Sequence, residues 1–341
     1  MTSLAEHSIP TSEIRPDRAI GLWLLACAGM VFVMALLGAV TRLSESGLSI
    51  MEWAPVSGAL PPLGEAEWQR LFALYKEIPE YQERPGGMTL AEFKAIFWWE
   101  YIHRLWGRLI GLVFAVPFLW FLLSGRIVWR RAWPYIGVFA LGGLQGAMGW
   151  FMVASGFADR TDVSQYRLVA HLSLALAIYG WLLWLAWQAL GPRAPGRGLS
   201  PALVAFTTLA VVTILSGGFV AGLNGGFVYN TFPLMGGQLV PSDYGFLEPW
   251  IANHLENPAT AQFNHRVLAV TTVFAALGLW LKAGRALAPV AVMALIQLGL
   301  GIATLLLVVP IWLGAAHQAG ALILFTLALR ALYLAPGRAD V

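Results

Sequence analysis

The stretch ALAPVAVMALIQLGLGIATLLLVVPIWLGAAHQAGALILFTLAL, residues 286–329, contains no charged residue. A helix needs about 20 apolar residues to cross the roughly 30 Å hydrocarbon layer of a membrane. This stretch is therefore long enough for two crossings. Pro310 and Gly314 interrupt its helical pattern, so we expect two consecutive transmembrane helices that meet near Pro310.

Apolar stretches of similar length occur throughout the chain. Of its 341 residues, 58% are hydrophobic and 11% are charged, which is typical of a protein embedded in lipid and not of a soluble domain. We predict an all-α integral membrane protein of eight transmembrane helices. The expected spans are residues 20–40, 103–123, 132–153, 168–190, 201–222, 264–281, 287–309 and 313–333.

The loops between these spans differ in charge. Basic residues in short loops mark the cytoplasmic side of a membrane protein, and the loops after spans two, four and six carry them. The fifth loop, residues 223–263, has no Lys or Arg but contains acidic residues, although Arg160 and Arg167 in the third loop weaken the asymmetry. We expect both termini on the cytoplasmic side of a bacterial inner membrane. The basic loop residues are Arg126, Arg130, Arg131, Arg193, Arg197, Lys282 and Arg285.

The net charge of +3 and the pI near 9.1 thus reflect membrane orientation and not binding to nucleic acid. Residues 1–19 have charges among prolines and no apolar core, so they do not predict a cleaved signal peptide. Cys27 is the single cysteine and lies in the first span, so one chain offers no disulfide and no cysteine-based metal site. The first loop, residues 41–99, predicts a small folded cap with helices near residues 65–76 and 89–97.

Four sequence landmarks occur twice in the same order, which predicts an internal repeat. Each half, residues 20–190 and 201–333, is expected to form one four-helix bundle, with residues 191–200 as a cytoplasmic linker and residues 334–341 as a cytoplasmic tail. Because four spans return the chain to its starting side, the repeat is parallel. The landmarks are G-x-V-x-x-L at 38–43 and 218–223, His-Arg at 103–104 and 265–266, Q-x-x-x-G at 145–149 and 297–301, and A-H-x-x-x-A-L at 170–176 and 316–322.

Each half contributes two histidines, His103 with His171 and His265 with His317. All four begin spans that run inward from the outer face, so they lie at similar depth. Two imidazoles that face each other across a bundle can ligate one haem iron. A lone intramembrane histidine more often hydrogen-bonds a neighbouring helix, but duplicated positions favour ligation. Zinc is disfavoured because no H-x-x-x-H or H-E-x-x-H spacing occurs.

Arginines accompany these histidines in both halves. Arg104, Arg108 and Arg266 lie within about one and a half helical turns of a histidine. They are placed to meet haem propionates, and snorkelling to lipid head groups is an equal alternative. His7 in the tail and His254 in the fifth loop are expected on the solvated surface.

One acidic residue distinguishes the two halves. Glu100 precedes His103 by three residues and shares its helix face, whereas the equivalent residue before His265 is Gln262. A carboxylate at a haem edge can act as a general acid or base, and an amide cannot. The first half is therefore expected to carry the chemistry, unless Glu100 merely favours the start of a helix.

The run EYIHRLWGR, residues 100–108, and the run GAVTRLSESGLSIMEWAP, residues 38–55, resemble the haem A synthase family. The resemblance extends over essentially the whole chain. It implies oxidation of the C8 methyl group of haem O to a formyl group, which gives haem A for cytochrome oxidases of the aa3 type. The first loop has no cysteine pair, which is similar to the alphaproteobacterial and mitochondrial branch.

The resemblance also implies roles for particular residues. His103 and His171 would face the substrate haem O, with Arg104 and Arg108 beside it, and Glu100 would assist the oxidation. His265 and His317 would ligate a permanent haem b that relays electrons. Haem O synthase and an electron donor are the implied partners, within membrane lipid.

Two other function classes fit part of this pattern. A di-haem electron carrier of the cytochrome b type would use both histidine pairs, but it would not need the difference between Glu100 and Gln262. A transporter or haem-handling assembly factor would line its path with polar groups at mid-depth. The sequence does not show such groups.

Overall fold

The computed structural model describes residues 16–55, 57–157, 160–191 and 199–335. The greater part of the predicted N-terminal tail, linker and C-terminal tail lies outside the described residues, as do Arg193 and Arg197. Within the described ranges the secondary structure is helical, and the β-type pairing is an isolated bridge between Met235 and Gln238. The all-helical prediction is confirmed.

The described part of the chain contains eight helices of 19 residues or more. By length and apolar composition they form seven candidate membrane spans, because α9, a 3-10 turn and α10 together count as one continuous segment, Pro258–Leu306. However, α9 and α10 pack against each other, so the chain reverses at the turn, Gly284–Leu287. The long helices are α1 (Arg18–Leu43), α4 (Leu90–Leu123), α5 (Trp133–Val153), α6 (Gln165–Leu190), α7 (Pro201–Gly222), α9 (Pro258–Ala283), α10 (Ala288–Leu306) and α11 (Ile311–Leu334).

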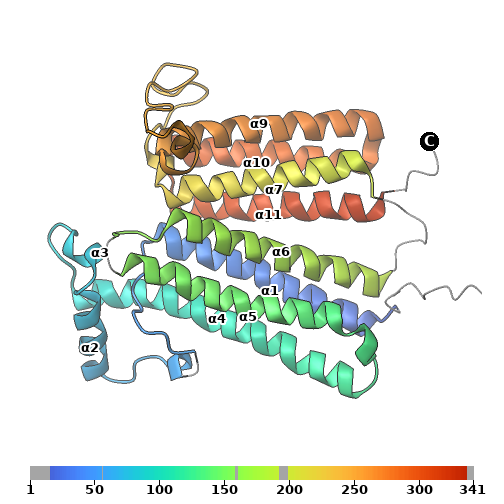
Figure 1. Ribbon diagram of the computed structural model, residues 1–341, viewed down its shortest axis with the longest axis horizontal. Helices are drawn as coiled ribbons and strands as arrows, with labels where there is room; N and C mark the ends of the chain where they lie inside the picture. Colours follow the sequence, from blue (N-terminus) through green and yellow to red (C-terminus); the bar gives the residue numbers. More distant parts are fainter. Residues whose placement is uncertain (1–15, 56, 158–159, 192–198, 336–341) are drawn as a thin grey trace, which may run out of the picture.

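These helices form two groups (Figure 1). One group is α1, α4, α5 and α6, and the other is α7, α9, α10 and α11. The groups meet where α1 packs on α11 and α6 packs on α7. Small residues allow this close approach: a Cβ on Gly314 would lie 2.5 Å from Leu43 Cδ1, and a Cβ on Gly222 would lie 2.7 Å from Gln165 Cβ.

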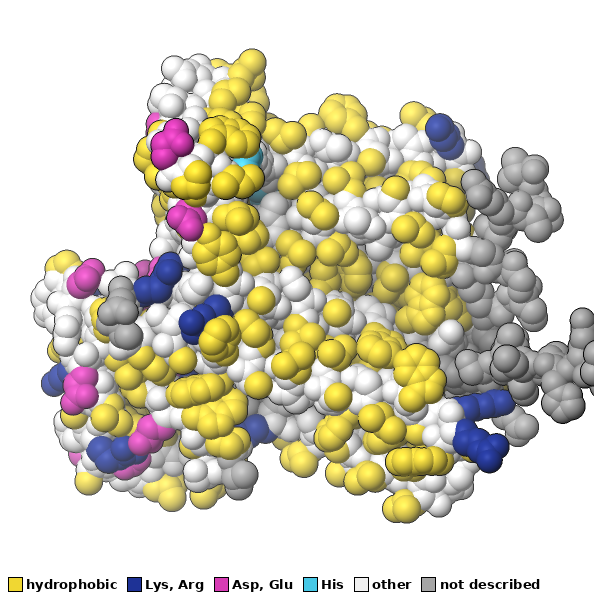
Figure 2. Space-filling view, viewed as in Figure 1, with side chains coloured by type: hydrophobic (Ala, Val, Ile, Leu, Met, Phe, Trp, Pro, Cys, Tyr) yellow, Lys and Arg dark blue, Asp and Glu magenta, His cyan; other side chains and the backbone are white. Residues whose placement is uncertain are grey.

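One end of the molecule, the cap end, carries the first loop and the fifth loop together, and α1 starts and α11 finishes at the opposite end (Figure 1). The cap, residues 44–89, contains the short helices α2 (Glu65–Tyr75) and α3 (Pro79–Gln82). Its aromatic side chains Trp68, Phe72 and Tyr75 form a hydrophobic core with Phe93 and Phe97 of α4. Acidic side chains gather at the cap end in the face shown in Figure 2.

The second predicted span was wrong at its start. The helix expected at residues 89–97 is not a separate cap element, because α4 runs without interruption from Leu90 to Leu123. The side chains of Thr89 and Glu92 form a capping box that begins the helix. The predicted first loop therefore ends at residue 89 and not at residue 99.

The predicted break in the last apolar stretch was right at Pro310 and wrong at Gly314. The helix α10 ends at Leu306, and Pro310 is the N-cap of α11. Val308 and Val309, with φ of 59° and 55°, make the turn in the left-handed region that β-branched residues rarely adopt. Gly314 lies inside α11, where its missing side chain makes room for Leu43.

Candidate functional site

The structure brings the second-half histidines, His265 of α9 and His317 of α11, face to face. Their ring centroids are 6.4 Å apart and their planes are perpendicular, at 89°. With metal–nitrogen bonds of about 2 Å and ring radii of about 1.1 Å, two axial imidazoles have centres about 6.2 Å apart. The separation of the two rings is therefore close to that of two imidazoles that share one metal ion.

Hydrogen bonds fix the outer nitrogens of this pair. The Ser216 hydroxyl donates to the Thr213 carbonyl oxygen at 2.7 Å and also lies 2.8 Å from His265 Nδ1. Because the hydroxyl proton is already used, His265 Nδ1 donates to Ser216, and Nε2 is left as a lone pair for a metal. The direction differs at His317, because the side-chain N–H groups of Gln297 donate to His317 Nδ1 at 3.1 Å and to the His317 carbonyl oxygen at 2.9 Å, so this Nδ1 is an acceptor.

The first-half histidines, His103 of α4 and His171 of α6, lie close enough to interact electrostatically. Their surroundings hold them less firmly. Nδ1 is buried without a hydrogen-bond partner in both residues. Gln145, the counterpart of Gln297, lies 3.2 Å from His171 Nε2 instead of Nδ1. The second-half imidazoles thus have a side-chain partner at each Nδ1 atom, and the first-half imidazoles have none there.

A glycine on a neighbouring helix faces each of the four imidazoles. A Cβ added to any of these glycines would lie within 3.2 Å of a histidine Cε1 atom. A larger residue would push the ring away from its present position. The sequence repeat contained three of the four glycines, Gly38, Gly149 and Gly301, but their role was not visible from spacing. The pairs are Gly38 with His103 (3.2 Å), Gly149 with His171 (3.1 Å), Gly217 with His265 (3.0 Å) and Gly301 with His317 (2.9 Å).

Glu100 is buried, with 2% of its surface exposed, one helical turn nearer the cap than His103. One carboxylate oxygen accepts hydrogen bonds from Ser49 Oγ and the Ile50 backbone N–H, both at 2.8 Å. The other accepts two from the Arg104 guanidinium, at 2.9 and 2.6 Å. Glu100 therefore ties the beginning of the cap to α4 beside the histidine pair.

The second half repeats this contact between a side chain and an arginine, with the amide of Gln262 in place of the Glu100 carboxylate. Gln262 Oε1 accepts a hydrogen bond from Arg266 at 2.8 Å, and Arg266 also donates to the carbonyl oxygens of Tyr229 and Thr231 in the fifth loop. In the first half, Arg104 donates to the carbonyl oxygens of residues 50 and 52. Each arginine holds a loop over the neighbouring histidine pair.

Arg108 extends this arrangement, because it donates to the carbonyl oxygens of Ala54 and Pro55. Its Nη1 atom is buried and has no partner. The guanidinium groups of Arg104 and Arg266 are engaged with protein groups, so the structure gives these arginines a loop-holding role that the sequence did not suggest. Contact between Arg104 or Arg108 and haem propionates stays a prediction.

A further polar network joins the two halves at the cap end. Arg42, at the end of α1, forms an ion pair with Asp162 at 3.2 Å and donates to Asn224 Oδ1 at 2.9 Å and to the Ala221 carbonyl oxygen at 3.1 Å. Asn224 Nδ2 in turn donates to Asp162 at 2.7 Å. Sequence reasoning missed this network, because its members come from three distant parts of the chain.

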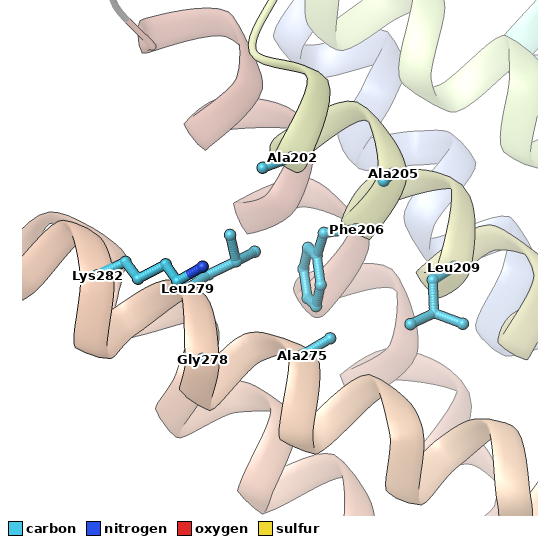
Figure 3. Close-up of a pocket in the computed structure, with 8 residues that line it drawn as sticks. All are labelled: Ala202, Ala205, Phe206, Leu209, Ala275, Gly278, Leu279 and Lys282. Atoms are coloured by element: carbon cyan, nitrogen blue, oxygen red, sulfur yellow. The ribbon is translucent and has the colours of Figure 1, made fainter. Parts of the chain in front are cut away.

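A groove in the described structure lies away from the histidines. This groove lies between α7 and α9 near their ends opposite the cap, has a volume of about 330 Å³ and is lined by small and apolar residues with Lys282 at its edge (Figure 3). Lys282 is 17 residues after His265 in α9, roughly 25 Å away along a helix. The described residues contain no cluster of three or more His, Cys, Asp or Glu side chains that would hold a free metal ion.

The chain is similar to known proteins over nearly its full length. Residues 21–329 match the COX15-CtaA family, described as "Cytochrome oxidase assembly protein". The chain is 51% identical to "Heme A synthase" of Rhodospirillum centenum, over 97% of this chain and 92% of that protein. It is 49% identical to "Heme A synthase" of Paramagnetospirillum magneticum, over 93% of both chains. It is 48% identical to "Heme A synthase" of Nitrosospira multiformis, over 92% of both chains.

Proposed function

The chain belongs to the COX15-CtaA family of cytochrome oxidase assembly proteins, and on this basis we propose that it is a haem A synthase, a membrane oxidoreductase that converts haem O to haem A. The single observation that carries the proposal is the full-length identity of about half the residues with proteins of that name. The duplicated histidine pairs fit it, since such an enzyme handles a substrate haem and, by our assignment, a resident haem.

We place the resident haem b on His265 and His317. The 6.4 Å separation of their rings suits an iron between them, and each Nδ1 atom lies within hydrogen-bond distance of a side chain, Ser216 for His265 and Gln297 for His317. A partner such as Ser216, which accepts from Nδ1–H, orients a ligating histidine and raises metal affinity. When bound, haem b supplies one-electron chemistry to the site.

We place substrate haem O on His103 and His171. Their Nδ1 atoms have no hydrogen-bond partner, so these imidazoles are held by fewer hydrogen bonds than the second-half pair as a haem arrives and leaves. A substrate site must release its product, whereas a cofactor site need not. The difference between the two pairs therefore supports this assignment and not the reverse one.

Glu100 is our candidate for the acid–base group. It lies on the His103 face of α4, one turn toward the cap, and its carboxylate is fixed by Ser49, Ile50 and Arg104. A fixed carboxylate can accept a proton from the carbon group that is oxidised or stabilise positive charge that develops there. Gln262 occupies the equivalent place in the haem b half and can do neither, which fits a half that only transfers electrons.

The same proposal includes the membrane topology. We infer eight crossings, two parallel four-helix repeats and a cap end that faces away from the cytoplasm, in a bacterial inner membrane. The reversal between α9 and α10 and the basic residues at the opposite end support it. The partners that the reaction requires are a source of haem O, for which haem O synthase is the candidate, and an electron donor.

The Glu100→Gln variant tests the catalytic assignment. Haems are extracted from the purified protein and identified by mass. We expect the variant to keep haem b and haem O and to form no haem A, because an amide cannot take a proton from the substrate. Gln262→Glu is the matched control in the other half and should form haem A as the unchanged protein does.

Three results would count against this assignment. Normal haem A formation by Glu100→Gln removes Glu100 from the reaction. Loss of haem b from the same variant would mean that Glu100 acts through the fold. Purified unchanged protein without any haem would refute the proposed function itself.

A further inference from the structure

The seam between α4 and α5 is closed at both ends by aromatic pairs. Toward the end opposite the cap, Phe114 of α4 and Phe139 of α5 have ring centroids 6.0 Å apart, and one turn further Phe118 and Tyr135 are 6.1 Å apart. At the cap end, Trp53 of the loop that Arg104 and Arg108 hold lies 5.2 Å from Trp150 of α5.

Between these aromatic pairs the facing residues are glycines. Tyr135, Phe139 and Trp150 mark one stripe of α5, and Gly142 and Gly146 lie on the same stripe at helical spacing. On α4, Gly111 continues the stripe of Phe114 and Phe118. All three glycines are exposed, and a Cβ on any of them would meet no atom within 4 Å. The described structure therefore has an opening in the middle of this seam.

The opening lies next to the first-half histidines. On α4, His103 lies two turns from Gly111, and on α5, Gly149, which contacts the His171 ring, lies less than one turn from Gly146. The buried Nδ1 atoms of His103 and His171 and the buried Oε1 of Gln145 have no hydrogen-bond partner. The open space beside the three glycines thus lies within about two helical turns of buried polar atoms that have no hydrogen-bond partner.

The second half provides the control, because its equivalent seam is filled. Eight residues after the histidine, Gly111 is replaced by Val273, which is buried. Counted from the repeated glutamine, Gly142 is replaced by buried Ala294 and Gly146 by Leu298. Val273 and Ala294 belong to one apolar cluster to which α7, α9, α10 and α11 all contribute, and Leu298 packs against it. α9 packs along α10 far more extensively than α4 packs along α5.

We propose that the opening lined by Gly111, Gly142 and Gly146 is a lateral portal for the long apolar tail of the substrate haem. The inference rests on the proposed function. A haem O molecule carries a farnesyl-type chain that is insoluble in water, so it must reach the site from the membrane with its tail in hydrocarbon. A haem b has no such tail, and the half assigned to it has no such opening. The portal thus lets the first half accept haem O, whose tail needs the opening, while the second half accepts haem b, which has no tail.

The double variant Gly111→Val with Gly146→Leu transfers the second-half residues into the first half. Both substitutions replace glycine in a helix with a better helix former, so the fold is retained. Protein in detergent, with its second-half site first saturated with haem b, is titrated with haem O or with further haem b, and the Soret band of the added haem is followed. We expect the dissociation constant for haem O to rise at least about tenfold and that for further haem b to change less than about twofold.

Ala140→Leu is the matched control. Ala140 follows Phe139 in α5 and is exposed, but at about 100° per residue it lies at least about 80° away from every residue of the α4-facing stripe. It should leave both dissociation constants unchanged. Equal weakening of both haems by the double variant, or no change for either, would overturn the portal and leave the proposed function intact. If the unchanged protein with a saturated second half takes up neither haem, both proposals fail.

Discussion

The glycines beside the histidines make a prediction that can be worked out from distances. In Gly301→Ala, the new Cβ would lie 2.9 Å from His317 Cε1, 3.5 Å from Nδ1 and 3.6 Å from Nε2. Carbon atoms in contact prefer at least about 3.5 Å, so the ring must move by about 0.6 Å. Overpacking of this kind costs about 1–3 kcal/mol, which corresponds to a loss of haem b affinity of roughly 5- to 150-fold.

Gly299→Ala separates this effect from a change in helix stability. Gly299 lies in the same helix, α10, and a Cβ there would meet nothing within 4 Å. Both substitutions favour the helix by about 1 kcal/mol, so only Gly301→Ala should weaken haem binding. Haem content per chain and the electron paramagnetic resonance g-values of the ferric low-spin haem are the assay. Identical haem content and g-values in the two variants would refute the claim that Gly301 positions His317.

Three further predictions follow from the same contacts. Ser216→Ala removes the acceptor for His265 Nδ1 and should lower haem b affinity by about 10- to 100-fold, while Ser216→Thr keeps the hydroxyl and should restore it; equal haem content in both would contradict the role of this hydrogen bond. Burial raises the pKa of Glu80 in the cap to about 8, with Asp162, Glu45 and Glu100 adding to the effect, so the folded cap keeps a proton that the unfolded cap releases above the ordinary value of 4.5. Cap stability should therefore fall as pH rises from about 5 to about 8, and limited proteolysis measures this change. If the stability of the Glu80→Gln cap falls with pH in the same way, Glu80 is not the cause. Arg104→Gln should speed hydrogen exchange of residues 49–53 several-fold without loss of haem b, and unchanged exchange would show that Arg104 does not hold the loop.

The sequence predicted the membrane fold because apolar length is a strong signal. It singled out the four histidines as candidate site residues because they recur at matched places in both halves. Hydropathy could not predict the extra turns of α4 between Leu90 and Tyr101, since this part of the helix is amphipathic and builds the cap core. The capping box of Thr89 and Glu92 was the available signal.

Other features depended on three-dimensional contacts that no spacing encodes. The loop carbonyl oxygens that Arg104 and Arg266 bind are more than 30 residues away in sequence. Likewise, the turn at Val308 and Val309 adopts a backbone conformation that their residue type disfavours, so a sequence pattern cannot predict it. The Asn230 side chain, which donates to the Leu305 carbonyl oxygen at 2.9 Å, helps to hold the chain there.

The difference between Glu100 and Gln262 was visible in the sequence, but its setting was not. In both halves the residue binds an arginine that holds a loop, so the first function of this position is structural. Only in the first half does the same side chain add a carboxylate beside the histidine pair. The repeat thus supplies a common scaffold on which one half differs by a single ionisable group.

The most direct test of the account is iron ligation by His265 and His317. Near-infrared magnetic circular dichroism of the ferric protein identifies the axial ligands of a low-spin haem. In protein loaded with one haem b per chain and no haem O, the account predicts a bis-histidine signal that disappears in His265→Ala and in His317→Ala and persists in His254→Ala. A bis-histidine signal that survives both substitutions in the second-half pair, or its absence from the unchanged protein, would contradict the account.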